Sequence, residues 1–75
     1  MLNITNLKVG ESATVFKLDV ENKIKMRLLE LGFTSGSCVK VLAISSLKKT
    51  VLLSVKGSAI AIRTSILQGV LICKN

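Results

Sequence analysis

The sequence contains no histidine, no proline, no tryptophan and no tyrosine, and its two aromatic residues are Phe16 and Phe33. Without histidine the chain has no imidazole for acid–base chemistry near neutral pH and no Ser-His or Cys-His nucleophilic pair. The four carboxylates are scattered rather than paired, which is typical of capping and surface charges. We therefore predict that the protein is not an enzyme and needs no cofactor.

Cysteine is also scarce, since the chain has two, Cys38 and Cys73. Two thiols allow at most one disulfide, and a structural zinc site needs four thiolate or imidazole ligands. Both cysteines lie among apolar residues of strand-like segments. We expect reduced thiols that pack in the core or at a sheet edge, and no metal site.

No apolar run approaches the ~20 residues of a membrane span, and the first residues lack the basic start and apolar stretch of a signal peptide. We expect a soluble cytoplasmic protein with one domain, 1–75. The mean hydropathy of +0.60 exceeds what so small a core can enclose, so some apolar side chains should form a contact patch on the surface.

Eleven Lys and Arg residues against four Asp and Glu give a net charge of +7. Such a charge attracts nucleic acid, lipid headgroups or an acidic protein face. The basic residues are spread along the chain, and the longest run is the pair Lys48-Lys49. We therefore favour the interpretation that the charge forms a solvated surface that keeps an apolar domain soluble.

Alternating apolar and polar residues, separated by glycines and small polar clusters, predict five strands and one helical turn. If side chains alternate strictly, Leu18 points to the face opposite to that of Val15 in the first strand. In the second strand, Ala43 then lies on the same face as Val41. The strands are Ser12–Leu18, Ser37–Ile44, Thr50–Lys56, Ser58–Arg63 and Gly69–Lys74, with the helical turn at 64–68.

A short amphipathic helix is expected after the first strand, because Ile24, Leu28 and Leu31 lie on one helical stripe. Asp19 or Asn22 is expected to cap its first turn. The polar stripe consists of Lys23, Arg27 and Glu30.

Several residues are predicted to have structural roles. Gly32 ends the helix in the left-handed conformation, and Phe33 folds back into the core with Leu31. Gly36 marks the turn before the second strand, and Gly57 supplies the positive φ of a tight hairpin. Together the elements predict a mostly β fold, a small five-stranded barrel with one inserted helix.

The run 27–41 resembles the signature of the FeoA family: an arginine, then Leu-Gly-Phe, then a glycine three residues on, then alternating valines. The opening Leu7–Glu11 and the hairpin Val55–Arg63 are also similar to that family. The resemblance covers nearly the whole chain, in the expected order. FeoA proteins are small cytoplasmic accessory proteins of bacterial ferrous iron transport.

The resemblance implies an SH3-like barrel that assists FeoB, the membrane iron permease with a cytoplasmic GTPase domain. Contact with the membrane would then occur only through this partner. Two loops depart from the family pattern. The basic turn Ser45–Lys49 replaces a Pro-Leu-Gly-Asp-like turn, and Ser65–Gln68 replaces a Glu-Ala pair.

We predict that Arg27 and Arg63 frame the surface that contacts the partner, together with the helix face around Lys23 and Glu30. Arginine makes forked hydrogen bonds that lysine cannot make. The alternative is intramolecular, with Arg63 paired to Glu30 or capping the helix carbonyls.

Two other functions compete with the accessory role. The charge of +7 suits a nucleic-acid-binding module, but two phenylalanines are too few for stacking platforms, so no nucleic acid is expected. Metal sensing through Cys38 and Cys73 is the third possibility, by analogy with the SH3-like domains attached to iron-dependent repressors.

Overall fold

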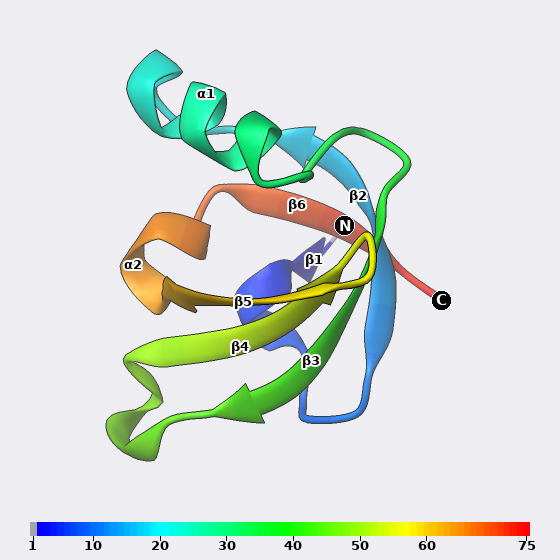
Figure 1. Cartoon of the computed structure of the whole chain (residues 1–75), viewed down its shortest axis with the longest axis vertical. Helices are drawn as coiled ribbons and strands as arrows, with labels where there is room; N and C mark the ends of the chain where they lie inside the picture. Colours follow the sequence, from blue (N-terminus) through cyan, green and yellow to red (C-terminus); the bar gives the residue numbers. More distant parts are fainter. Residues whose placement is uncertain (1) are drawn as a thin grey trace.

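Six antiparallel strands form one sheet in the computed structural model, which describes residues 2–75 (Figure 1). The order across the sheet is β1-β6-β2-β3-β4-β5, so β1 and β5 are its two edges. The strands are β1 (Leu2–Asn3), β2 (Ser12–Leu18), β3 (Cys38–Ile44), β4 (Thr50–Val55), β5 (Ser58–Arg63) and β6 (Val70–Lys74).

Two α-helices and two 3-10 turns connect the strands. Helix α1 (Asn22–Glu30) follows β2, and the single turn α2 (Thr64–Leu67) joins β5 to β6. The 3-10 turns are η1 (Ile4–Asn6) and η2 (Ser46–Lys48). The predicted mostly β fold, the amphipathic helix and the turn before the last strand are confirmed.

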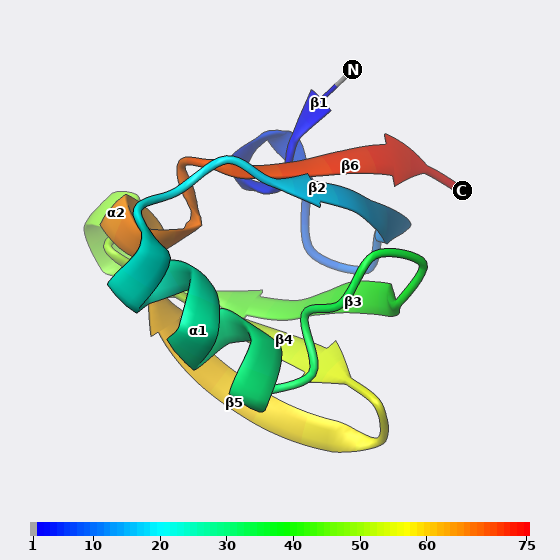
Figure 2. The same cartoon turned by 90° about the horizontal axis from the view of Figure 1, so that it is seen from above.

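The prediction of a closed five-stranded barrel is wrong, because the sheet has a sixth strand and stays open between its edges. Strand β1 pairs with β6 through Leu2 opposite Ile72 and Asn3 opposite Leu71. Two residues are too few to show an alternation in the sequence. Helix α1 lies between β2 and β5, across the open side of the sheet (Figure 2).

The inner face of the curved sheet encloses the core, and Phe33 is its largest fully buried side chain. Leu28 is buried under α1, while Ile24 and Leu31 pack against the core from the same helix face, as predicted. The buried apolar residues are Ile4, Leu7, Ala13, Val15, Leu18, Leu28, Phe33, Val39, Val41, Val51, Leu53, Val55, Ile62, Leu67, Val70 and Ile72.

Strict alternation fails in β2 because the pairing of β2 with β6 shifts register between Val15 and Lys17. A bulge inserts one extra residue and turns the following side chains to the other face. Leu18 is therefore buried on the same face as Val15, and Phe16 is 50% exposed. The predicted placement of Leu18 is wrong.

The same irregularity occurs in β3, where the pairing with β4 shifts between Val41 and Ala43. Ala43 is exposed, and Ile44 packs partly against the core. Ala43 therefore does not share the face of Val41, as strict alternation predicted. The two bulges bend the longest strands of the sheet.

Helix α1 ends as predicted but begins differently. Gly32 has a φ of 103°, and hydrogen bonds run from Phe33 N to Leu28 O (3.0 Å) and from Gly32 N to Leu29 O (3.1 Å). This is a Schellman motif. The N-cap is Glu21, which makes no side-chain capping bond, so the prediction that Asp19 or Asn22 caps the helix is wrong.

The β4–β5 hairpin turns at Lys56 and Gly57, whose φ angles are 49° and 82°. Two successive positive φ angles are typical of a type I′ turn, which matches the twist of the flanking strands. The predicted role of Gly57 is confirmed. Gly36 also has a positive φ, 92°, in the turn before β3.

Glu11 joins the start of β2 to the end of β6. Its carboxylate accepts a hydrogen bond from Lys8 N (2.7 Å) and forms an ion pair with Lys74. The hydrogen bond to Lys74, and after it the bond to the Lys8 backbone, lowers the pKa of Glu11 below its ordinary value. A carboxyl whose pKa is lower in the folded protein stabilises the fold above its unfolded pKa.

That stabilisation is lost as the pH falls through the folded-state pKa of Glu11, which lies below the ordinary carboxyl value. We expect Glu11→Gln to melt at a lower temperature than the wild type at pH 7, with the difference shrinking as the pH is lowered through the pKa of Glu11. Circular dichroism melting curves of both proteins across this range measure it. A difference that stays constant with pH would contradict the role of the charge.

Candidate functional site

A groove lies between helix α1 and the edge strand β5, and we call it the α1–β5 groove. Its volume is about 260 Å³. Its floor is apolar, and an arginine contributes to its lining from each side. The lining residues are Arg27, Leu28 and Leu31 from α1, Ala61, Ile62 and Arg63 from β5, and Ile66 from α2.

Local sequence explains how each arginine reaches the groove. In α1, Leu28 is buried and its neighbour Arg27 lies at the boundary of the apolar stripe, exposed in the last turn. A cation there also interacts favourably with the helix dipole. In β5, Ile62 is buried, so Arg63 next to it points to the other face and is exposed.

Arg27 and Arg63 thus line one groove, although they lie far apart in the sequence. Lys23 and Glu30 are exposed on α1 but do not line the groove. Leu31 contributes to the groove wall, which the prediction of a purely structural role did not include.

The intramolecular alternative for Arg63 is not formed. Within residues 2–75, the ion pair between Lys74 and Glu11 is the one salt bridge, and neither arginine side chain donates a hydrogen bond. Arg63 therefore neither pairs with Glu30 nor caps the helix carbonyls. Both guanidinium groups at the groove are available to an external acceptor.

A second hollow lies on the other flank of α1, between the helix and β2. It includes the exposed side chains of Phe16 and Leu29 beside Lys17 and Lys25. The composition predicted apolar side chains on the surface, and these two, with Met26 at 61% exposure, are among them. The two flanks of α1 therefore differ in their cations: arginines on one side and lysines on the other.

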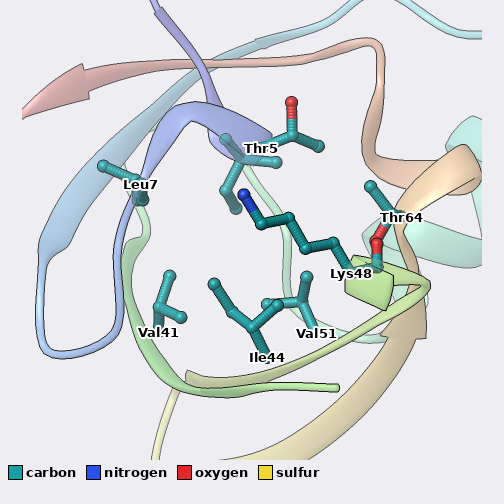
Figure 3. Close-up of a pocket in the computed structure, with 8 residues that line it drawn as sticks. Thr5, Leu7, Val41, Ile44, Lys48, Val51 and Thr64 are labelled. Carbon is teal, nitrogen blue, oxygen red and sulfur yellow. The ribbon is translucent and has the colours of Figure 1, made fainter. Parts of the chain in front are cut away.

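The basic turn that departs from the family pattern closes a small cavity of about 90 Å³. Figure 3 shows the Lys48 side chain stretched across this cavity toward Thr5, above apolar side chains that include Ile44 and Val51. Thr64 fixes the turn, because its Oγ1 donates to Lys48 O (2.6 Å) and its N donates to Lys49 O (2.9 Å).

Sequence reasoning missed this cavity. The basic pair was visible, but its placement depends on positive φ angles at Leu47 and Lys48. Lys48, Lys49 and Arg63 also line a wider polar hollow beside α2. Arg63 is therefore shared between the α1–β5 groove and this cationic surface.

The two cysteines are free thiols, and both are exposed, so the prediction that they pack in the core is wrong. They lie on either side of Thr14, which pairs with Cys38 on β3 and with Cys73 on β6. Two strand spacings separate their Cα atoms by about 10 Å, too far for a disulfide. The same separation does not suit a single ion that needs both sulfurs about 2.3 Å away.

Within residues 2–75, no three cysteine, aspartate or glutamate side chains lie together as potential metal ligands. Among the same residues, neither helix is long and apolar enough to cross a membrane.

Comparison with known proteins connects this geometry to a family. The FeoA domain matches residues 2–73 of the chain. No curated protein matches the sequence. Several solved structures have a similar fold, among them two FeoA proteins and one IdeR protein.

The FeoA protein of Chlorobium tepidum is 25% identical, with a TM-score of 0.88 over 95% of this chain and 68% of that one. FeoA of Stenotrophomonas maltophilia is 27% identical, with a TM-score of 0.78 over 97% of this chain and 91% of that one. The latter was solved with zinc and described as a procaryotic SH3 domain protein, with a suggested role as an activating factor of ferrous iron transport.

IdeR of T. acidophilum is 24% identical, with a TM-score of 0.86 over 99% of this chain and 34% of that one. At that identity the likeness shows a shared fold alone. The likeness to the S. maltophilia structure confirms the predicted SH3-like fold, with an open six-stranded sheet in place of the barrel. The chain belongs to the FeoA domain family.

Proposed function

We propose that this protein is a non-catalytic accessory protein of bacterial ferrous iron uptake, and that it docks on the cytoplasmic GTPase region of the FeoB permease through the α1–β5 groove. One observation carries the proposal. Two arginines without intramolecular partners flank an apolar groove, and both belong to segments that match the family pattern.

The groove has the composition of a protein-binding surface. The partly exposed side chains of Leu31 and Ile66 supply apolar contact, and the guanidinium groups of Arg27 and Arg63 supply polar contact at the rim. Interfaces are typically apolar at the centre, polar at the rim and enriched in arginine. A partner surface with apolar side chains between carboxylates would complement it.

The chemistry of the chain favours a role without catalysis. It contains no histidine and none of its carboxylates lines the groove, so GTP hydrolysis and iron transport would be performed by the permease. The protein would act in the cytoplasm and would meet the membrane only through this partner.

The competing functions receive less support from the geometry. Phe33 is fully buried, so Phe16 alone remains as a stacking platform for nucleic acid. The separation of Cys38 and Cys73 across Thr14 does not favour a metal sensor that uses both thiols.

Calorimetric titration of this protein into the purified GTPase domain of the same organism's FeoB tests the proposal. We expect saturable binding with one site per domain. Single-stranded DNA, titrated in parallel at moderate salt, should bind weakly or not at all. Absence of binding to the GTPase domain would contradict the proposal, and tight salt-sensitive binding to DNA would replace it with the nucleic-acid function.

A further inference from the structure

We propose that the partner segment in the α1–β5 groove is an extended, acidic peptide that pairs with β5 as an added strand of the sheet. This inference rests on the proposed docking function and specifies how the docking occurs. Addition of a strand to an exposed sheet edge is a common mode of peptide recognition, in which main-chain hydrogen bonds give affinity and side-chain pockets give specificity.

The register of the hairpin decides which backbone groups of β5 are free. In an antiparallel pair, residues alternate between those bonded to the partner strand and those that point away. Val55 pairs with Ser58 across the two-residue turn, and the ladder continues to the hydrogen bond from Thr64 N to Lys49 O (2.9 Å). Ser58, Ile60 and Ile62 therefore bond to β4.

Ala59 and Ala61 consequently direct their N–H and C=O groups away from β4, toward the free edge. Within residues 2–75, no backbone or side-chain hydrogen bond satisfies these groups. Both side chains are exposed and small, so an approaching strand can reach the backbone.

This edge also lacks the protection that sheet edges usually have. Native edges are blocked by proline, by charged side chains, by a bulge or by a covering element. The stretch Ser58–Ile62 contains no proline and no charge, and its register with β4 has no bulge. Helix α1 lies alongside but leaves the groove of about 260 Å³ open.

The walls of the groove indicate the side chains that the added strand would carry. Leu28 and Leu31 face it from the helix, and Ile66 lies at its α2 end. Alternate side chains of an added strand would point to this apolar wall. The unpaired guanidinium groups of Arg27 and Arg63 select carboxylates at the two sides of the groove.

A second copy of this chain fits the edge less well. Each copy has a net charge of +7, and each would bring Arg27 and Arg63 to the shared edge. Like charges facing one another across an interface oppose association. Charge complementarity therefore favours an acidic segment of a different protein.

Amide hydrogen exchange measured by NMR tests the pairing directly. In the free protein, the outward amides of Ala59 and Ala61 should exchange fast, and those of Ile60 and Ile62 slowly. Addition of the FeoB GTPase domain should slow exchange at Ala59 and Ala61 by at least about tenfold. Binding without such protection would overturn strand addition while leaving the proposed function intact, whereas absence of binding would overturn both.

A substitution gives an independent measurement. Proline at an edge position whose N–H points outward removes that donor without breaking a ladder bond. We expect Ala61→Pro to weaken binding to the GTPase domain by about tenfold. The proline removes one main-chain hydrogen bond to the added strand, and its ring disturbs the adjacent bond. Ala61→Ser, which keeps the N–H and nearly the same size, is the matched comparison, and it should bind about tenfold more tightly than Ala61→Pro.

Melting curves and amide spectra of both variants establish that they fold. Equal affinities of folded Ala61→Pro and Ala61→Ser would overturn strand pairing at this edge. If Ala61→Pro does not fold, the exchange measurement on the wild type decides alone. Formation of a dimer that protects the same amides without any partner would assign the edge to self-association instead.

Discussion

The substitution Gly69→Ala is expected to destabilise the protein by at least about 4 kcal/mol, which is a large part of the stability of a small domain. A Cβ atom at Gly69 would lie 2.0 Å from Asp19 O and 2.5 Å from Val20 Cγ1. The contact cannot relax easily, because Asp19 N donates a hydrogen bond of 2.7 Å to Gly69 O. This bond holds the segment after β2 against the start of β6.

Gly10→Ala is the matched control, because a Cβ there would meet no atom within 4 Å. Gly10 has a φ of 91°, so its replacement should cost only the conformational strain of about 1–2 kcal/mol. Urea unfolding curves of both variants measure the difference. Similar stabilities for the two variants would show that the close approach at Gly69 does not require glycine.

The second large effect concerns binding. We expect the double substitution Arg27→Glu with Arg63→Glu to weaken affinity for the FeoB GTPase domain by at least about a hundredfold. Each guanidinium–carboxylate hydrogen bond contributes roughly 1.5–3 kcal/mol, and each reversed charge adds repulsion. Because both side chains are exposed and unpaired within the fold, the loss of stability should not exceed about 1–2 kcal/mol, which comes from the charge reversal near the C-terminus of α1.

The control is Lys17→Glu with Lys25→Glu, on the other flank of α1. Both double variants exchange two cations for two carboxylates and so lower the net charge of +7 equally. The control should weaken binding by no more than about fivefold, through the loss of long-range attraction. Equal losses in the two double variants would mean that overall charge, and not the α1–β5 groove, determines binding.

Much of the local structure could be predicted from the sequence because it depends on neighbours in the chain. The helical stripe around Leu28, the end of α1 at Gly32 and the turn at Gly57 are all encoded within a few residues. The bulges after Val15 and Val41 could not be predicted in this way. They depend on the register with a partner strand, which the periodicity of one segment does not contain.

The candidate site, too, could be predicted only in part from the sequence. Its two arginines were predicted from the family resemblance, but their meeting in one groove follows from the position of α1 across the open sheet. The need for glycine at position 69 comes from a contact with Asp19, far away in the chain. The free edge of β5 follows from the strand order, which no local pattern shows.

Chemical-shift mapping tests most directly whether the α1–β5 groove is the docking site. The isotope-labelled protein is titrated with the unlabelled GTPase domain of the same organism's FeoB, and its amide spectrum is followed. We predict that the largest changes occur at Arg27, Leu31, Ala61 and Arg63. Changes concentrated at the η2 turn or on the outer face of β3, with the groove unaffected, would contradict docking through this groove.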